Sequence, residues 1–479
     1  MQLSNDLLCL ILDLFKEEED RVTLFRCCLV NWEFNRAASR VLYSEVFLNI
    51  RPSGASNPSR SGNEKFCNKI LSSASLPQNA AYVKVLRVKG YPDSLSETLF
   101  PAVKTFSNLQ IVEIAPDQSR DDLFTPILEE LVNRPSLVEL HVNSACTDEI
   151  NAPLLSKISG LVSLGLEGPN RAILQLLLDW LGRLTSLQEL HLTRNCGSIT
   201  PGVLRSFVPF LANITAFSLG ISYSITDDDL FKFLAQLPCL ERVQLRHYLQ
   251  WKVSAPGDPL KRLHSLTVCH DSSDEDEFVD MLCAWIIRAI TASPIECIRF
   301  CCDEFPTHNE APRGFDALVE HLSRSNADTL RVLDLKGWLI SAPSVSLLFG
   351  TCAALEELVT ALDSDGFQEF KNLIPTMKRL HTAVVLVICD FADAPFETVS
   401  AEEVVQIMQN SDSLRRLAVN EWRIEGSWVP QQDGVRFVVQ HSLDAPSEEE
   451  APEIDVPQSQ HSPQAPAMDA ILEEEEEEE

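Results

Sequence analysis

Three short stretches, LVELHV (137–142), LVSLGL (161–166) and LQELHL (187–192), share the pattern L-x-x-L-x-L and decide the fold. The apolar residues at positions 1, 4 and 6 alternate in or near period two, so they face one side of a short strand. The pattern returns as ITAFSL (214), LERVQL (240), LHSLTV (263), IECIRF (295), LRVLDL (330) and LRRLAV (414), with weaker copies starting at 83, 109, 355 and 377. About thirteen copies, mostly 22 to 28 residues apart, indicate a repeat architecture.

Amphipathic helices are predicted between the strands, for example over 171–184, 227–237 and 276–290. Thr226 precedes an acidic run, and Ser400 has Glu403 in capping-box spacing, so both are expected to cap a helix. A strand followed by a helix, repeated many times, stacks into a curved solenoid with a parallel sheet on its concave side. We therefore predict an α/β solenoid over residues 81–428.

Length and composition agree with a folded, repeat-based chain. A chain of 479 residues is too long for one ordinary core unless repeats build that core. The stretch LLCLILDLF (7–15) lacks a preceding basic residue and a cleavage site, and no run of 18 apolar residues occurs elsewhere. The 14 cysteines have no regular spacing, so we expect free thiols and a cytoplasmic or nuclear protein.

The charge is concentrated at the C-terminus. Residues 429–479 hold 15 acidic residues against one base, which is −14 of the net charge of −31. Their content of Pro, Gln and Ser predicts a disordered acidic tail. Such charge repels nucleic acid and anionic membranes, so neither is expected as a ligand. Near the other end, RPSGASNPSRSGN (51–63) predicts a polar linker over 51–80.

Residues 1–50 are predicted to form a small helical domain. Phe25, Cys28, Leu29 and Trp32 follow one another at i, i+3, i+4 and i+7, which favours one apolar helix face. Cys27 lies about 100° from Cys28 around such a helix, so the two thiols diverge. No C-x-x-C motif or nearby His completes a metal site, and we interpret both cysteines as packing residues.

The N-terminus resembles the F-box family, in particular its divergent fungal-type members. The resemblance rests on LSNDLLCLI (3–11), LVNWEF (29–34) and NRAASRVLYSEV (35–46). Ser4, Asn31, Trp32 and Arg40 stand where the family commonly has Pro, Cys, Arg and Pro. The resemblance implies a partner-binding surface made of Leu3, Leu7, Leu8, Ile11, Leu29, Val30, Phe34, Leu42 and Tyr43.

Residues 81–428 resemble the leucine-rich repeat family in their strand pattern. The Asn that normally follows the strand occurs only in LQELHLTRN, as Asn195, so the other turns must satisfy their backbone groups differently. An F-box followed by leucine-rich repeats implies the substrate-receptor subunit of a cullin-based (SCF-type) ubiquitin ligase. In that family the F-box binds the cullin linker protein, the repeats hold the protein substrate, and other subunits carry the catalysis.

Strand positions 3, 5 and 7 are expected on the concave face. The candidates for substrate binding there are Glu139, His141, Glu189, His191, Arg242, Gln244, Arg246 and Arg299. His141 and His191 lie two repeats apart, roughly 10 Å at ~4.8 Å per strand, which is too far for one metal ion. The three arginines either bind an acidic or phosphorylated segment of a substrate or pair with neighbouring acids.

No active site, metal site or cofactor site is predicted. The sequence contains no phosphate-binding glycine loop and no nucleophile elbow, and CIRFCC (297–302) lacks further metal ligands. The alternative to a ligase subunit is a stand-alone solenoid, either a binding protein or a GTPase regulator, whose N-terminal helices only cap the repeats.

Overall fold

The structure, a computed structural model, describes residues 5–15, 21–50, 60–91, 95, 97–117, 121–247, 260–270, 276–302, 314–388, 399–431 and 434–442. In this part of the chain, one sheet of 16 strands runs through the molecule, and each strand pairs with its neighbour in the sequence. The strands from β1 to β14 are parallel, and β15 and β16 continue the sheet as antiparallel strands. The predicted fold class, an α/β leucine-rich-repeat-like solenoid with a parallel concave sheet, is confirmed.

The strands begin and end at regular places in the repeats. They are β1 (Glu45–Ile50), β2 (Val85–Gly90), β3 (Ile111–Pro116), β4 (Glu139–Asn143), β5 (Ser163–Glu167), β6 (Glu189–Asn195), β7 (Ala216–Ile221), β8 (Arg242–His247), β9 (Ser265–His270), β10 (Cys297–Cys302), β11 (Val332–Ile340), β12 (Glu357–Leu362), β13 (Thr382–Val387), β14 (Arg416–Val419), β15 (Trp422–Gln431) and β16 (Gly434–Ser442).

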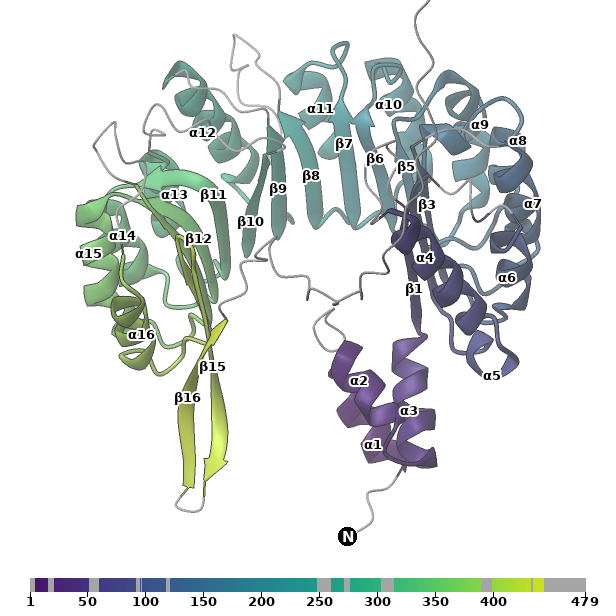
Figure 1. Cartoon of the computed structure of the whole chain (residues 1–479). Coiled ribbons are helices and arrows are strands. Elements are labelled where there is room, and N and C mark those ends of the chain that lie inside the picture. Colours follow the sequence, from purple (N-terminus) through teal and green to yellow (C-terminus); the bar gives the residue numbers. More distant parts are fainter. Residues whose placement is uncertain are drawn as a thin grey trace, which may run out of the picture.

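The helices form two groups. The N-terminal group is α1 (Asn5–Leu12), α2 (Arg21–Cys28) and α3 (Trp32–Leu42). The second group covers the convex side of the sheet, as Figure 1 shows: α4 (Arg60–Ala74), α5 (Pro77–Ala80), α6 (Leu99–Thr105), α7 (Asp121–Val132), α8 (Ala152–Leu155), α9 (Arg171–Arg183), α10 (Pro201–Phe207), α11 (Asp227–Leu234), α12 (Asp276–Ile290), α13 (Asp316–Ser325), α14 (Ala342–Thr351), α15 (Ser364–Leu373) and α16 (Ala401–Gln409).

The core lies between the sheet and the convex helices. In the first repeat quoted above, Leu137, Leu140 and Val142 expose at most 2% of their surface, as the pattern predicts. The predicted caps are also present, because the Thr226 side chain accepts a hydrogen bond from the Asp229 amide and Ser400 accepts one from the Glu403 amide. Each repeat shares its apolar face with the next one, so a single continuous core extends along the solenoid.

The solenoid begins earlier than predicted. β1 pairs with β2 in the common register, Glu45 opposite Val85, so Tyr43, Val46 and Leu48 occupy positions 1, 4 and 6 of a further repeat. The prediction of a helical domain over 1–50 is wrong at its end, because residues 45–50 form β1. The prediction of a linker over 51–80 is wrong where α4 and α5 follow β1. Cys67, Leu71 and Ala74 are buried along α4, and that spacing was obscured by the Ser- and Gly-rich residues before it.

The continuous helix predicted across Phe25 and Trp32 is also wrong. α2 ends at Cys28, and Asn31 caps α3 by accepting a hydrogen bond from the Phe34 amide at 2.9 Å. Asn35 donates to the carbonyl oxygen of Cys28 at 2.8 Å, which fastens the turn between the two helices. Asn at an N-cap favours a helix start, and this local preference overrides the apolar spacing.

Two further predictions near the C-terminus need correction. The copy placed at 377 is shifted by three residues, because Leu380, Ala383 and Val385 fill the buried positions of β13. The acidic tail predicted over 429–479 starts too early, because β15 and β16 form an antiparallel pair that reaches Ser442. The alternating apolar residues of GVRFVV suit a strand, while residues 443–479 lie outside the described part.

In the turns after the strands, backbone atoms find hydrogen-bond partners other than the consensus Asn, as expected. Asn195 itself is exposed and accepts a hydrogen bond from the Gly197 amide. The next residue, Cys196, is fully buried, and its thiol lies 3.4 Å from the Leu192 carbonyl oxygen. One repeat later, Ser222 occupies the position that corresponds to Cys196, and its hydroxyl donates to the Ile199 carbonyl oxygen at 2.7 Å.

Aromatic side chains fill the core behind the ends of β8 to β11. His247 contacts Trp285 edge to face at 5.2 Å between ring centroids, and the Trp338 indole nitrogen donates to His270 at 3.2 Å. Burial, together with the neighbouring His270, lowers the pKa of His247 to about 4. His247 is therefore neutral in the folded protein at neutral pH.

This buried histidine predicts a loss of stability in mild acid. The unfolded chain binds a proton at His247 near pH 6.5 and the folded chain only near pH 4, so stability falls as the pH drops through this window, by up to about 1.4 kcal/mol per pH unit. In thermal melts between pH 7 and pH 5, His247→Gln should show a smaller decrease in Tm than the wild type. The exposed His381 provides the control: His381→Gln should keep the wild-type decrease. Equal decreases for all three proteins would contradict the prediction.

Candidate functional site

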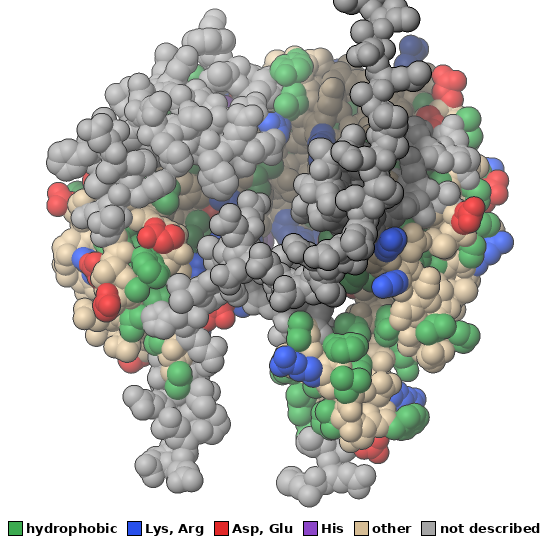
Figure 2. Space-filling view, viewed as in Figure 1, with side chains coloured by type: hydrophobic (Ala, Val, Ile, Leu, Met, Phe, Trp, Pro, Cys, Tyr) green, Lys and Arg blue, Asp and Glu red, His purple; other side chains and the backbone are tan. Residues whose placement is uncertain are grey.

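Large apolar side chains remain exposed on the module formed by α1, α2 and α3. They are Leu7, Leu10, Ile11, Leu14, Val22, Phe25, Leu29, Val30 and Trp32. Trp32 exposes 71% and Leu29 72% of its surface, and Figure 2 shows hydrophobic side chains gathered on this module. So many exposed apolar groups on three short helices favour a protein-binding surface.

The module nevertheless has a core of its own. Leu8, Leu12, Leu24, Ala37, Ala38 and Val41 form a cluster that is separate from the core of the solenoid. Helices that only capped the solenoid would extend the solenoid core, whereas these helices bury their central residues against one another.

The structure divides the predicted partner-binding residues into three groups. Leu7, Ile11, Leu29 and Val30 are exposed, and Phe34 and Leu42 are half-buried against the module core. Leu8 is a core residue with 3% exposure, and Leu3 lies outside the described residues. The exposed Leu10, Leu14 and Val22 were not predicted. The apolar residues on every side of α1 could have indicated Leu10, because a helix that is apolar all round must bury more than one face.

Tyr43 joins the module to the solenoid. Its ring packs against the solenoid core, and its hydroxyl lies 2.7 Å from the Ser73 hydroxyl at the end of α4. The next residue, Ser44, accepts hydrogen bonds from the amides of Lys84 and Val85. Only Tyr43 and Ser44 separate α3 from β1, so the junction is short and anchored on both sides.

The concave face is polar, and its charges are largely paired. Positions 3, 5 and 7 of the strands are open to this face while positions 4 and 6 are buried. Arg87 lies 3.2 Å from Glu45 and 3.4 Å from Glu113, and Lys89 lies 2.7 Å from the same Glu113. Pairing of this kind leaves a surface of alternating charge that suits polar protein segments.

The centre of the concave face holds the two predicted histidines on either side of a glycine. A Cβ atom on Gly165 would lie 1.9 Å from Nδ1 of His141, so the histidine ring occupies the space that a side chain on β5 would fill. The rings of His141 and His191 stack with 5.8 Å between centroids, although their strands are two apart. The predicted distance of roughly 10 Å between them is therefore wrong for the rings.

Each histidine contacts a carboxylate two residues before it. Nε2 of His141 lies 3.1 Å from Glu139 and Nε2 of His191 lies 3.4 Å from Glu189. The hydrogen bond with His141 lowers the pKa of Glu139. Burial lowers the pKa of His191, and its Nδ1 lies 2.7 Å from the Ser218 hydroxyl. The pair is thus held in place by neighbours on three strands.

The predicted arginine patch consists partly of ion pairs. Arg242 lies 2.5 Å from Glu189, two strands away, because the small Ala216 stands between them. Burial raises the pKa of Glu189, but the hydrogen bonds and charges of Arg242 and His191 together outweigh it, and the pKa is lowered. Arg299 pairs in the same way with Glu357 at 3.2 Å. For Arg242 and Arg299, these contacts favour the interpretation that the arginines pair with acids.

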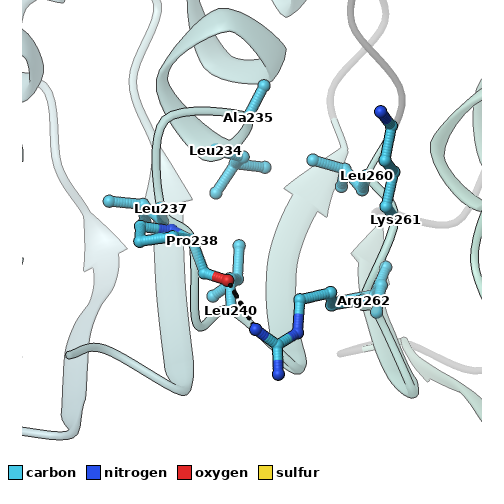
Figure 3. Close-up of a pocket in the computed structure, with 9 residues that line it drawn as sticks. Leu234, Ala235, Leu237, Pro238, Leu240, Leu260, Lys261 and Arg262 are labelled. Atoms are coloured by element: carbon cyan, nitrogen blue, oxygen red, sulfur yellow. Dashed lines mark hydrogen bonds between the residues drawn. The ribbon is translucent and has the colours of Figure 1, made fainter. Parts of the chain in front are cut away.

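Two adjoining hollows open on the concave face. One of about 310 Å³ is lined by His141, Gly165, His191 and Gln244 among others, and one of about 630 Å³ extends to Arg194, Tyr223, Arg246 and Cys269. A third hollow, of about 360 Å³, lies beside the chain entering β9. Figure 3 shows that its lining is mainly leucine, with Arg262 donating to the Pro238 carbonyl oxygen. The polar groups that suit recognition thus lie on the concave face.

The described residues contain neither a cluster of metal ligands nor a helix suited to a membrane. No group of three or more His, Cys, Asp or Glu side chains there is placed to hold a metal ion. Within the same ranges, no helix is long and apolar enough to cross a membrane.

Comparisons with known proteins found similarity to solved chains but no matching family. No protein-family model matches the sequence, and no curated protein is similar to it. One similar solved chain belongs to the crystal structure of the Rad7 and Elc1 complex in yeast, with 11% sequence identity and a TM-score of 0.37. That match covers 84% of this chain and 90% of the other chain. These comparisons assign the chain to no family.

Two glycine substitutions should distinguish an effect on the histidine stack from an effect on the stability of the fold. Gly165→Ala displaces the His141 ring and breaks the histidine stack, but a side chain can rotate, so we expect a change in stability within about 1 kcal/mol. At Gly220 a Cβ atom would lie 2.0 Å from the backbone oxygen of Arg194, and Gly220→Ala should cost about 2 kcal/mol or more. Denaturant unfolding measures both, and NMR of the His141 and His191 ring protons reports the stack. The explanation is wrong if Gly165→Ala leaves the ring resonances unchanged.

Proposed function

We propose that this protein is a substrate receptor of a cullin-based ubiquitin ligase. The module of α1 to α3 docks onto the cullin linker protein, and the concave face of the solenoid holds the protein to be modified. The receptor then acts by proximity, because it raises the effective concentration of substrate lysines near the conjugating enzyme. Catalysis itself belongs to the other subunits of the ligase.

The exposed apolar surface of the N-terminal module is the observation that carries this proposal. The module buries its own core and still exposes Leu7, Ile11, Leu29 and Val30, which are residues that the F-box resemblance places at the partner. Exposing them to water is unfavourable by about 25 cal/mol per Å² of apolar area, so a binding partner that covers them gains this energy. The linker protein is the partner that the resemblance implies.

The concave face supports the second half of the proposal. Its ion pairs and the stacked His141 and His191 offer donors and acceptors over several strands. A surface with many paired charges discriminates between partners, because a wrong partner separates charges without replacing their contacts. The residues that we propose for contact with the substrate are Glu139, His141, Glu189, His191, Arg242, Gln244, Arg246 and Arg299.

Paired point variants of the full-length protein test the docking role. Leu29→Ser combined with Val30→Ser removes exposed apolar area only, so we expect at least a tenfold loss of affinity for the purified linker protein and an unchanged Tm. Phe66→Ser, at an exposed apolar residue on α4 (62% exposed), serves as the matched control and should bind normally. Affinity can be measured by isothermal titration calorimetry.

The same experiment can contradict the proposal in two ways. A wild-type chain that does not bind the linker protein excludes the role, and so does full binding by the Leu29 and Val30 double variant. The core variant Leu8→Ala separates folding from docking, since it should lower the stability of the module by about 2 to 5 kcal/mol.

A further inference from the structure

Two cysteines lie side by side on the concave face. Cys269 in β9 and Cys301 in β10 are register partners on neighbouring parallel strands, and both occupy position 7 of their repeat. Neighbouring strands are about 4.8 Å apart, and a disulfide needs Cα atoms roughly 4.4 to 6.8 Å apart. Among the strand partners that the structure describes, this is the one pair in which both residues are cysteine.

The curvature of the sheet brings side chains on this face closer together than the backbone spacing indicates. Cys269 and Cys301 are only one strand apart and point to the same side. The side chains of Cys269 and Cys301 form a hydrogen bond, so their sulfur atoms lie close together, as a cross-strand bond requires.

The surroundings of Cys269 are polar and open. Gln244 donates a hydrogen bond to its sulfur at 3.5 Å, and Arg246 is its register partner on β8. Cys269 lines the concave hollow of about 630 Å³, which admits a small oxidant. The hydrogen bond with Cys301, followed by burial, raises the pKa of Cys269, so Cys269 keeps its proton while the other sulfur reacts.

We propose that Cys269 and Cys301 form a reversible disulfide across the concave face when the protein meets a peroxide. The sulfur of Cys301 attacks one peroxide oxygen and becomes a sulfenic acid, and the first water leaves. The sulfur of Cys269 then attacks the sulfenic sulfur, the S–S bond forms, and the hydroxyl group leaves with the Cys269 proton as the second water. Two thiols are oxidised by two electrons and one peroxide is reduced to two waters.

On the described strands, no other cysteine has a cysteine as its register partner. Cys67, Cys146, Cys196, Cys283 and Cys352 are buried. Cys297 is the most informative comparison, because it lies on β10 and on the same face as Cys301, but its register partner on β9 is Ser265. Cys297 therefore lies on the same strand as Cys301 and is also half-buried, but the residue opposite it on β9 is a serine.

The disulfide can be tested on the reduced full-length protein. After treatment with hydrogen peroxide and alkylation of the remaining thiols, peptide mass mapping without reductant should show one cross-linked peptide joining Cys269 and Cys301. Its mass should lie about 2 Da below the sum of the two peptides, and a thiol reductant should reverse it. Cys269→Ser and Cys301→Ser should each abolish this peptide, whereas Cys297→Ser should leave it intact.

A gain-of-function variant keeps the test independent of losses in folding. Ser265→Cys places a thiol beside Cys297 in the same geometry, and a second disulfide should appear between these two positions. The inference is overturned if peroxide leaves Cys269 and Cys301 alkylated as before, if they link only between two molecules, or if Cys297→Ser removes the cross-link. None of these outcomes depends on binding to the cullin linker protein, so the result is separate from the proposed function.

Discussion

The backbone hydrogen-bond ladder between consecutive strands is the constraint on which the rest of the structure depends. A single repeat cannot bury the apolar side chains of positions 1, 4 and 6, but a stack of repeats buries them in one continuous core. The parallel register then repeats every side chain of the concave face in rows across the sheet. The histidine stack, the ion pairs and the cysteine pair are all consequences of these rows.

Most of the solenoid could be predicted from the sequence, because leucines in period two are a strong signal. Two repeats, those of β1 and β13, were not predicted correctly. The first repeat begins with Tyr43 in place of Leu, and the repeat of β13 has Ala383 in place of Leu at position 4, so neither shows the expected pattern. At Asn31, the capping preference of one residue divided a helix that the apolar spacing had predicted as continuous.

The candidate site was less predictable, since it depends on which side chains meet across strands. The rows could be predicted from the register, but the approach of His141 to His191 depends on the missing side chain of Gly165 and on the curvature of the sheet. Likewise, Arg242 reaches Glu189 only because Ala216 leaves room between them. Small residues thus determine the contacts, and a pattern of charges alone does not reveal them.

Under the proposed function, the two-residue junction at Tyr43 and Ser44 has a consequence for how a substrate would be presented. A flexible tether would let many lysines visit the conjugating enzyme, each at a low effective concentration. A short junction, anchored at Ser73, Lys84 and Val85, would hold the concave face at a set distance from the proposed linker protein. In a ligase built on this receptor, this fixed distance would select the modified lysines. Only lysines at a matching position on the bound protein would reach the conjugating enzyme.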